Sequence, residues 1–314
     1  MKTKSPIPLI WDADGSPDSV VSLLYFLQHP GIKVKAATIS CGQAVPDVFV
    51  RKLSRMFARI DRRDVPFSAG RNKPLFGNNA FPPPWRKGTN TFWGLELPGS
   101  GVTPYQGTAV DLLLQTLHRS PIPMHLFISG TQTNLAEALR IDPNIGRKID
   151  SVHIMGGALG VPGNMHSEWS ESDNEVSEWN IWVDPLAAQE VFQADVQRHL
   201  TPLDATNQVI WTRRDAQDWV DTGTKEGVLA GEILHWFLED LGMEGFYFWD
   251  LLTAVNLTDP QFSRTQEAHI KVLVEPEAEQ GRTVVHSDIP RNTTVFLEPD
   301  GEKVKSRVLE VLGF

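Results

Sequence analysis

Three aspartates lie close together near the N-terminus, in residues 11–19, which read Trp-Asp-Ala-Asp-Gly-Ser-Pro-Asp-Ser. The carboxylates of Asp12, Asp14 and Asp18 would repel one another unless a cation or hydrogen-bond donors neutralise them. A hard metal ion with oxygen ligands is one solution. The other is an exposed turn in which Asp18 caps the following helix. The segment alone leaves both interpretations open.

The elements around this segment alternate between strands and helices. An apolar run at residues 7–11 predicts a strand, and the amphipathic residues 20–28 predict a helix that ends at the breakers Pro30 and Gly31. Residues 33–40 and 45–60 repeat the order of strand and helix. Alternation of this kind is typical of parallel sheets, in which ligands collect at the carboxyl ends of the strands.

The rest of the chain continues this order. The predicted strands lie at residues 124–129, 151–155, 197–203, 271–274 and 293–297, the predicted helices at 134–140 and 185–192, with a short helix at the C-terminus. Residues 72–107 and 161–180 break the pattern and are expected to be lids or binding loops. The sequence therefore predicts one α/β domain over residues 1–314, with a mostly parallel, open, Rossmann-like sheet flanked by helices.

Composition excludes several classes of function. The net charge of -10 argues against a nucleic-acid partner, which requires clustered basic residues. No run of about twenty apolar residues predicts a membrane span, and the N-terminus lacks the apolar stretch of a signal peptide, so we expect a cytoplasmic protein. The single cysteine, Cys41, excludes an intramolecular disulfide and is expected to be a small buried residue.

Several motifs together resemble those of the inosine/uridine-preferring nucleoside hydrolase family. The first is the aspartate segment, in which Ser19 stands where the family has a fourth acid. The others follow in the family's order: a Thr-Asn-Leu-Ala turn at residues 133–136, a glycine motif at 154–164, Glu-Trp-Asn at 178–180, Val-Asp-Pro at 183–185, and Trp-Asp at 249–250. The shared order is far more specific than any one motif.

The resemblance implies a Ca²⁺ site and a general base. By position, the metal ligands are Asp14, Ser19, the carbonyl oxygen of Thr133, and Asp250. All are oxygen donors, as a hard cation requires. Because the metal lowers the pKa of its bound water, Asp14 is expected to accept the proton of that water, which then cleaves the N-glycosidic bond.

The resemblance also implies a set of ribose contacts. Asp18, Asn164, Glu178 and Asn180 are expected to hold the sugar hydroxyls, with Met155 packed beside them. Fixed acceptors make chemical sense because cleavage passes through an oxocarbenium-like ribosyl cation. Without the resemblance, Met155 would be core filling, and Glu178 and Asn180 would belong to a solvated polar loop. Asn134 would have an equally good role as a helix cap.

The residue before Asp250 distinguishes two branches of the family. One branch has a histidine there that protonates the leaving base, and the other has a tryptophan that stacks on a purine. This chain has Trp249 and so resembles the purine branch. Trp85 or Trp93 is a candidate for a second stacking face. The alternative for each tryptophan is ordinary packing.

The departures from the family leave alternatives open. Ser19 replaces a charged ligand, and Gln43 and Gln132 replace an asparagine and an apolar residue, which brings metal affinity into question. The leading hypothesis is a purine or broad-range nucleoside hydrolase that forms a homo-oligomer, a dimer or a tetramer. A binding protein for nucleosides or ribose with impaired catalysis is the second, and a hydrolase of a modified ribosyl compound the third. A serine hydrolase is disfavoured because no Gly-x-Ser-x-Gly motif occurs.

Overall fold

The fold was analysed in a computed structural model, which describes residues 5–165, 172–286 and 292–314. The second predicted irregular segment, 161–180, therefore lies partly outside the described residues. The strands are β1 Ile7–Ala13, β2 Ile32–Ile39, β3 Phe67–Ala69, β4 Met124–Ser129, β5 Ile149–Met155, β6 Arg198–Thr201, β7 Ile210–Thr212, β8 Gly245–Tyr247, β9 Ser263–Val272, β10 Thr283–His286 and β11 Thr293–Pro299. The α-helices are α1 Pro17–Gln28, α2 Pro46–Arg59, α3 Pro83–Thr91, α4 Ala109–Arg119, α5 Thr133–Ile141, α6 Trp179–Val183, α7 Pro185–Gln193, α8 Leu203–Thr206, α9 Arg213–Asp221, α10 Lys225–Leu241, α11 Trp249–Thr258 and α12 Gly301–Leu312.

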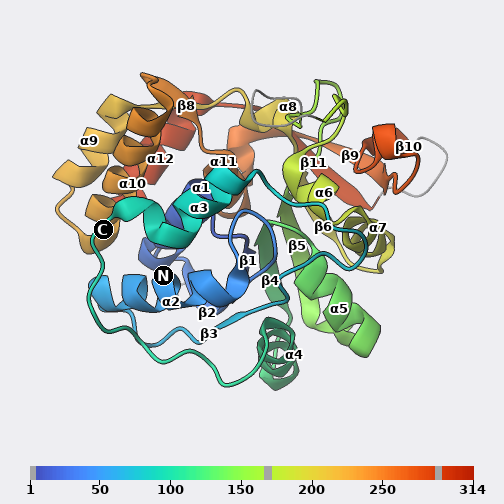
Figure 1. The fold of residues 1–314 in the computed structure, drawn as a ribbon, viewed down its shortest axis with the longest axis horizontal. Helices are drawn as coiled ribbons and strands as arrows, with labels where there is room; N and C mark the ends of the chain where they lie inside the picture. The colour runs from blue at the N-terminus through green and yellow to red at the C-terminus, as the bar shows by residue number, and fades with distance from the viewer. Residues whose placement is uncertain (1–4, 166–171, 287–291) are drawn as a thin grey trace.

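The described strands form one large sheet in the order β10-β9-β11-β6-β5-β4-β1-β2-β3, and β7 pairs with β8 apart from it (Figure 1). From β11 to β3 all neighbours are parallel, whereas β9 runs antiparallel to both β11 and β10. The mostly parallel sheet flanked by helices confirms the predicted fold class.

Helices cover both faces of the sheet. One face is buried against α1, α2, α10, α11 and α12, and the other against α4, α5 and α7. Alternate residues of β1 divide between the two cores, since Leu9 and Trp11 belong to the first and Ile10 to the second. This alternation follows from the two-residue period of a strand that is buried on both sides.

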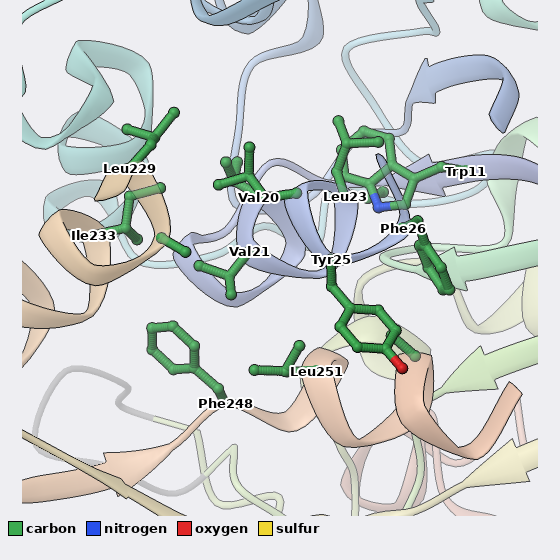
Figure 2. Close-up of a cluster of buried hydrophobic side chains, with 14 of the residues drawn as sticks. Trp11, Val20, Val21, Leu23, Tyr25, Phe26, Leu229, Ile233, Phe248 and Leu251 are labelled. Atoms are coloured by element: carbon green, nitrogen blue, oxygen red, sulfur yellow. The ribbon is translucent and has the colours of Figure 1, made fainter. Parts of the chain in front are cut away.

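Helix α1 is the most deeply buried helix beside the sheet. It begins at Pro17, with the Ser16 side chain as its N-cap, and residues 17–26 are all buried. Figure 2 shows side chains of α1 between Leu229 and Ile233 of α10 and Leu251 of α11. A helix that is enclosed on all sides holds the loop before it firmly, and that loop carries the aspartates.

Most predicted elements of the first half are present, with boundaries shifted by a few residues. Strand β1 extends to Ala13, so that Asp12 lies in the strand and not in the turn. Of the two interpretations of the aspartate segment, the one in which Asp18 caps the next helix was wrong, because Ser16 is the cap. The strand predicted at 271–274 is the end of the much longer β9, and the segment 72–107 contains the unpredicted helix α3. No described helix is long and apolar enough to cross a membrane.

Candidate active site

Asp14 directly follows β1 and is held in place by backbone donors. Its Oδ1 accepts a hydrogen bond from the Ser16 N–H at 3.2 Å, and its Oδ2 accepts one from the Gln43 N–H at 2.8 Å. Two glycines allow this close packing. A Cβ atom at Gly42 would lie 2.5 Å from the Asp14 carboxylate, and one at Gly130 would lie 2.7 Å from the Asp14 nitrogen. The position of Asp14 therefore depends on three separate loops.

The Ser19 hydroxyl lies between the carboxylates of Asp14 and Asp250. It donates to Asp250 Oδ2 at 2.6 Å and is 3.5 Å from Asp14 Oδ1. Asp18 turns to the other side, where its Oδ1 accepts from the Ser16 hydroxyl at 2.7 Å and its Oδ2 accepts from the Asp250 N–H at 3.3 Å. The fold thus brings the predicted residues of the aspartate segment together with Asp250 of α11.

A carbonyl group that faces this cluster comes from Ser129. Ser129 ends β4, and its carbonyl oxygen accepts a hydrogen bond from the Ser19 hydroxyl at 3.1 Å. The Thr133 hydroxyl donates to Asp184 at 2.6 Å. Sequence reasoning missed Ser129. Its place in the site depends on the pairing of β4 with β1, where Ala13 lies opposite Ser129, and no local pattern signals it.

Burial governs the electrostatics of the cluster. Desolvation raises the pKa of Asp14 to about 7, with a further upward contribution from the charge of Asp18. Burial also raises the pKa of Asp18, and burial together with the charge of Asp18 raises the pKa of Asp250 well above its usual range. Buried carboxylates of this kind are destabilised as anions and would be stabilised by a cation.

The oxygen atoms around the Ser19 hydroxyl could serve as ligands of a cation. The described residues contain no group of three or more His, Cys, Asp and Glu side chains arranged to hold a metal ion. Around the Ser19 hydroxyl, however, the donors are all oxygens: the carboxylates of Asp14 and Asp250 and the carbonyl of Ser129. Oxygen ligands suit Ca²⁺. The set therefore fits a hard cation, with one charged ligand fewer than an aspartate at position 19 would give.

Glu178 and Asn180 are buried, not solvated. Glu178 caps α6, and its carboxylate accepts from the N–H groups of Gly157, Asn180 and Ile181. Burial raises its pKa to about 7. The Asn180 amide donates to the carbonyl oxygen and the sulfur of Met155, both at 3.3 Å. The interpretation of these residues as a solvated polar loop was therefore wrong.

Asn164 is half-buried and joined to the start of α6. Its side-chain oxygen accepts from the Trp179 N–H at 3.1 Å, and its carbonyl oxygen accepts from the Trp179 indole at 3.0 Å. These two hydrogen bonds hold Asn164 beside Trp179. Glu178 directly precedes Trp179, and its carboxylate accepts a hydrogen bond from Gly157 in the glycine motif that follows β5.

Trp249 begins α11 beside the carboxylates. It packs against the small apolar cluster of Met155, Ala158 and Leu203, and its indole donates to Asn207 at 2.8 Å. Met155 is therefore at once core filling and a neighbour of Trp249. The Trp249 ring is half-buried and also contacts Phe246 and Tyr247, at 5.4 Å and 6.0 Å between ring centroids.

The other candidate tryptophans lie elsewhere. Trp93 is only 5% exposed and packs against Phe92 and Trp236, so it offers no stacking face. Trp85 is half-buried and contacts Phe81 and Trp179, the latter at 5.5 Å between ring centroids. Of the two, only Trp85 reaches a residue that adjoins the candidate site.

Asn134 has a role other than helix capping. Gln132 is the N-cap of α5, and the Asn134 amide donates to Asp12 Oδ1 at 2.8 Å. Thr38 donates to the same oxygen at 2.8 Å. Asp12 is fully buried, and desolvation raises its pKa to about 7. These contacts tie β1, β2 and α5 together beneath the site.

Comparison with known proteins gives consistent results. The family model described as inosine-uridine preferring nucleoside hydrolase matches residues 9–306. The pyrimidine-specific ribonucleoside hydrolase RihA of Citrobacter koseri is 32% identical over 98% of each chain, and RihA of Salmonella schwarzengrund is 31% identical over 98% of this chain and 99% of that protein. Among solved structures, the plant nucleoside hydrolase PpNRh1 has a TM-score of 0.86 at 24% identity and covers 98% of this chain and 99% of its own. The purine-preferring ribonucleoside hydrolase of Gardnerella vaginalis also has a TM-score of 0.86, at 23% identity, with 98% of each chain covered.

Proposed function

The chain belongs to the inosine-uridine preferring nucleoside hydrolase family, and we propose that Asp14, Asp18 and Asp250 form the centre at which it hydrolyses ribonucleosides. Ribonucleoside hydrolysis follows from family membership. The reaction breaks the bond between C1′ of ribose and a base nitrogen, and water supplies the new hydroxyl. The observation that carries the proposal is the convergence of the buried Asp14 and Asp250 carboxylates on one hydroxyl beside a strand-end carbonyl.

In this mechanism Asp14 accepts the proton of the attacking water. A carboxylate beside the attacking water can accept its proton, and Asp14 is buried at the carboxyl end of β1. The hydrogen bonds from Ser16 and Gln43 fix its direction. Asp14 would therefore be oriented before the substrate arrives, which lowers the barrier without reorganisation.

A Ca²⁺ ion would be held by Asp14, Asp250, the Ser129 carbonyl and the Ser19 hydroxyl. When bound, it would neutralise the carboxylates and make a coordinated water more acidic. The carbonyl oxygen of Thr133, which the family resemblance implies as a ligand, stays in the proposed set, because the bond that Thr133 donates to Asp184 involves only its hydroxyl. The Ser19 hydroxyl donates its hydrogen to Asp250, and its oxygen has two lone pairs that could face a cation.

The ribose would be held by Asp18, Asn164, Glu178 and Asn180. As the glycosidic bond breaks, positive charge develops on the sugar, and fixed oxygen acceptors nearby stabilise it. Glu178 already accepts three backbone N–H groups and keeps further lone pairs for a hydroxyl. The carbonyl oxygen of Met155 accepts a hydrogen bond from the Asn180 amide and so holds this side chain in place.

We propose a purine preference, carried by Trp249. A tryptophan face binds a two-ring base over a larger area than a pyrimidine, and no histidine precedes Asp250. Pyrimidine preference is the second candidate, because two relatives that are 31% and 32% identical are named as pyrimidine-specific. Release of free ribose from inosine, adenosine, uridine and cytidine, with and without a chelator, distinguishes the two. Faster turnover of uridine than of inosine would contradict the purine proposal.

A further inference from the structure

An aromatic cleft lies between α3 and α6, and Trp179, which directly follows Glu178, is part of its lining. Its volume is about 680 Å³. The lining residues include Phe81, Arg86, Asn90, Trp179 and Trp182. Aromatic rings of this kind bind flat groups. Two positively charged residues, Arg86 and Lys87, also line the cleft, although the protein as a whole has a net charge of -10.

Both walls of the cleft are attached to the proposed catalytic centre. On one side the Val45 N–H donates to Asn90 at 2.9 Å, and the preceding Ala44 N–H donates to the Asp14 carbonyl at 2.8 Å. On the other side Trp179 directly follows Glu178. A ribose held between Asp14 and Glu178 would therefore place one of its substituents at the mouth of the cleft.

Arg86 is a cation without a partner in this cleft. Within the ranges that the structure describes, its guanidinium forms neither an ion pair nor a hydrogen bond, and its Nε is buried without an acceptor. Leaving a buried donor unsatisfied costs about 1 to 3 kcal/mol, more if it is charged. The terminal nitrogens of the guanidinium also lack a protein acceptor among the described residues, and an acceptor that enters the cleft would meet them.

The reaction produces an acceptor of this kind. When the C1′–N bond breaks, its electron pair stays on the base nitrogen, and the negative charge spreads over the ring and its exocyclic oxygen. None of the described histidines contacts the carboxylates or Trp249, so none is in place to protonate the base. Arginine offers a planar set of donors that matches such a delocalised anion.

We propose that Arg86 stabilises the departing nucleobase as its negative charge develops, and so acts as a further catalytic residue. This inference rests on the proposed function, because it assumes that the ribose lies between Asp14 and Glu178. The electron pair moves to the base, the ribosyl cation takes up the hydroxyl of water, and Asp14 receives the released proton. Arg86 keeps its own protons and contributes charge and donors.

Two substrates with different leaving groups test the proposal. Inosine leaves as a poor anion, whereas 4-nitrophenyl riboside releases a phenolate that is stable without help. Arg86→Met should lower kcat/KM for inosine about 100-fold, the usual effect of removing one transition-state donor, and for the nitrophenyl compound by less than about threefold. Arg86→Lys should recover part of the inosine activity. Arg55→Met, which removes an exposed arginine from α2, is the matched control and should leave both rates unchanged.

The outcomes distinguish failure of the role of Arg86 from failure of the proposed ribonucleoside hydrolysis. Equal losses on both substrates, or no loss on inosine, would overturn the role of Arg86 while leaving ribonucleoside hydrolysis intact. Failure of the wild-type protein to release ribose from either compound would contradict the proposed function itself. If Arg86→Met does not fold, as judged by thermal unfolding, Arg86→Gln removes the charge with smaller change in polarity and gives the same comparison.

Discussion

Replacement of Ser19 by aspartate tests the metal requirement both without Ca²⁺ and with Ca²⁺ added. The Ser19 hydroxyl is 2.6 Å from an Asp250 oxygen and 3.5 Å from an Asp14 oxygen. A new carboxylate there would face two others in a buried site. Two like charges about 4 Å apart repel by about 4 kcal/mol at an effective dielectric constant near 20. Because proton uptake relieves part of this repulsion, we expect metal-free Ser19→Asp to lose about 2 to 4 kcal/mol of unfolding free energy.

Ca²⁺ should reverse the effect. An aspartate can bind through two oxygens and cancels part of the charge of the ion, so Ser19→Asp should bind Ca²⁺ at least about tenfold more tightly, a gain of about 1.4 kcal/mol. At a free Ca²⁺ concentration of about 100 times Kd, binding adds about 2.7 kcal/mol to the stability of the folded state. The variant should therefore be less stable than wild type in chelator and should regain stability as Ca²⁺ is added.

Urea unfolding in chelator and in Ca²⁺, together with calorimetric titration, measures both quantities. Ser19→Asn is the matched control, because it has nearly the same size as aspartate without the charge. Equal stability of Ser19→Asp and wild type in chelator would refute the placement of this residue among the carboxylates. Equal Ca²⁺ affinity of the aspartate and asparagine variants would refute its role as a ligand.

Two further substitutions test how the nucleobase is recognised and how the buried Asp12 is held in place. Trp249→Ala should lower kcat/KM for inosine at least about tenfold more than for uridine, because the larger base loses more stacking area; equal losses would show that the residue only supports the fold. Asn134→Ala removes a 2.8 Å hydrogen bond to the buried Asp12 and should cost about 1 to 3 kcal/mol in urea unfolding. Asn144→Ala on the surface is its control, and equal stability of the two variants would contradict the role given to Asn134.

Local patterns in the sequence predicted the parts of the site that depend on neighbouring residues. The apolar run before Asp14 predicted β1, and the order of strands and helices predicted a parallel sheet with the aspartates at its carboxyl edge. The motifs also predicted that Asp250 joins these residues from far along the chain. The structure places it 2.6 Å from Ser19.

Features that depend on packing between distant segments were missed. Ser129 reaches the cluster through the register of β4 against β1, which no local pattern encodes. Trp93 looks like a loop tryptophan, but Trp236 of the unpredicted α10 covers it. Glu178 looks like part of a polar loop, although its carboxylate caps α6 in the interior. Ser129 and Trp93 have partners far away in sequence, and Glu178 also accepts from the distant Gly157, so composition and periodicity carry no signal for these contacts.

The central claim is that Asp14 accepts a proton during ribonucleoside hydrolysis. Its most direct test is ribose release from inosine by wild type and by Asp14→Asn at saturating Ca²⁺, with circular dichroism to establish folding. Asparagine keeps the size of the side chain but accepts no proton, so kcat should fall at least about 1,000-fold. Retention of more than about a tenth of wild-type kcat, a barrier change of only about 1.4 kcal/mol, would contradict the account.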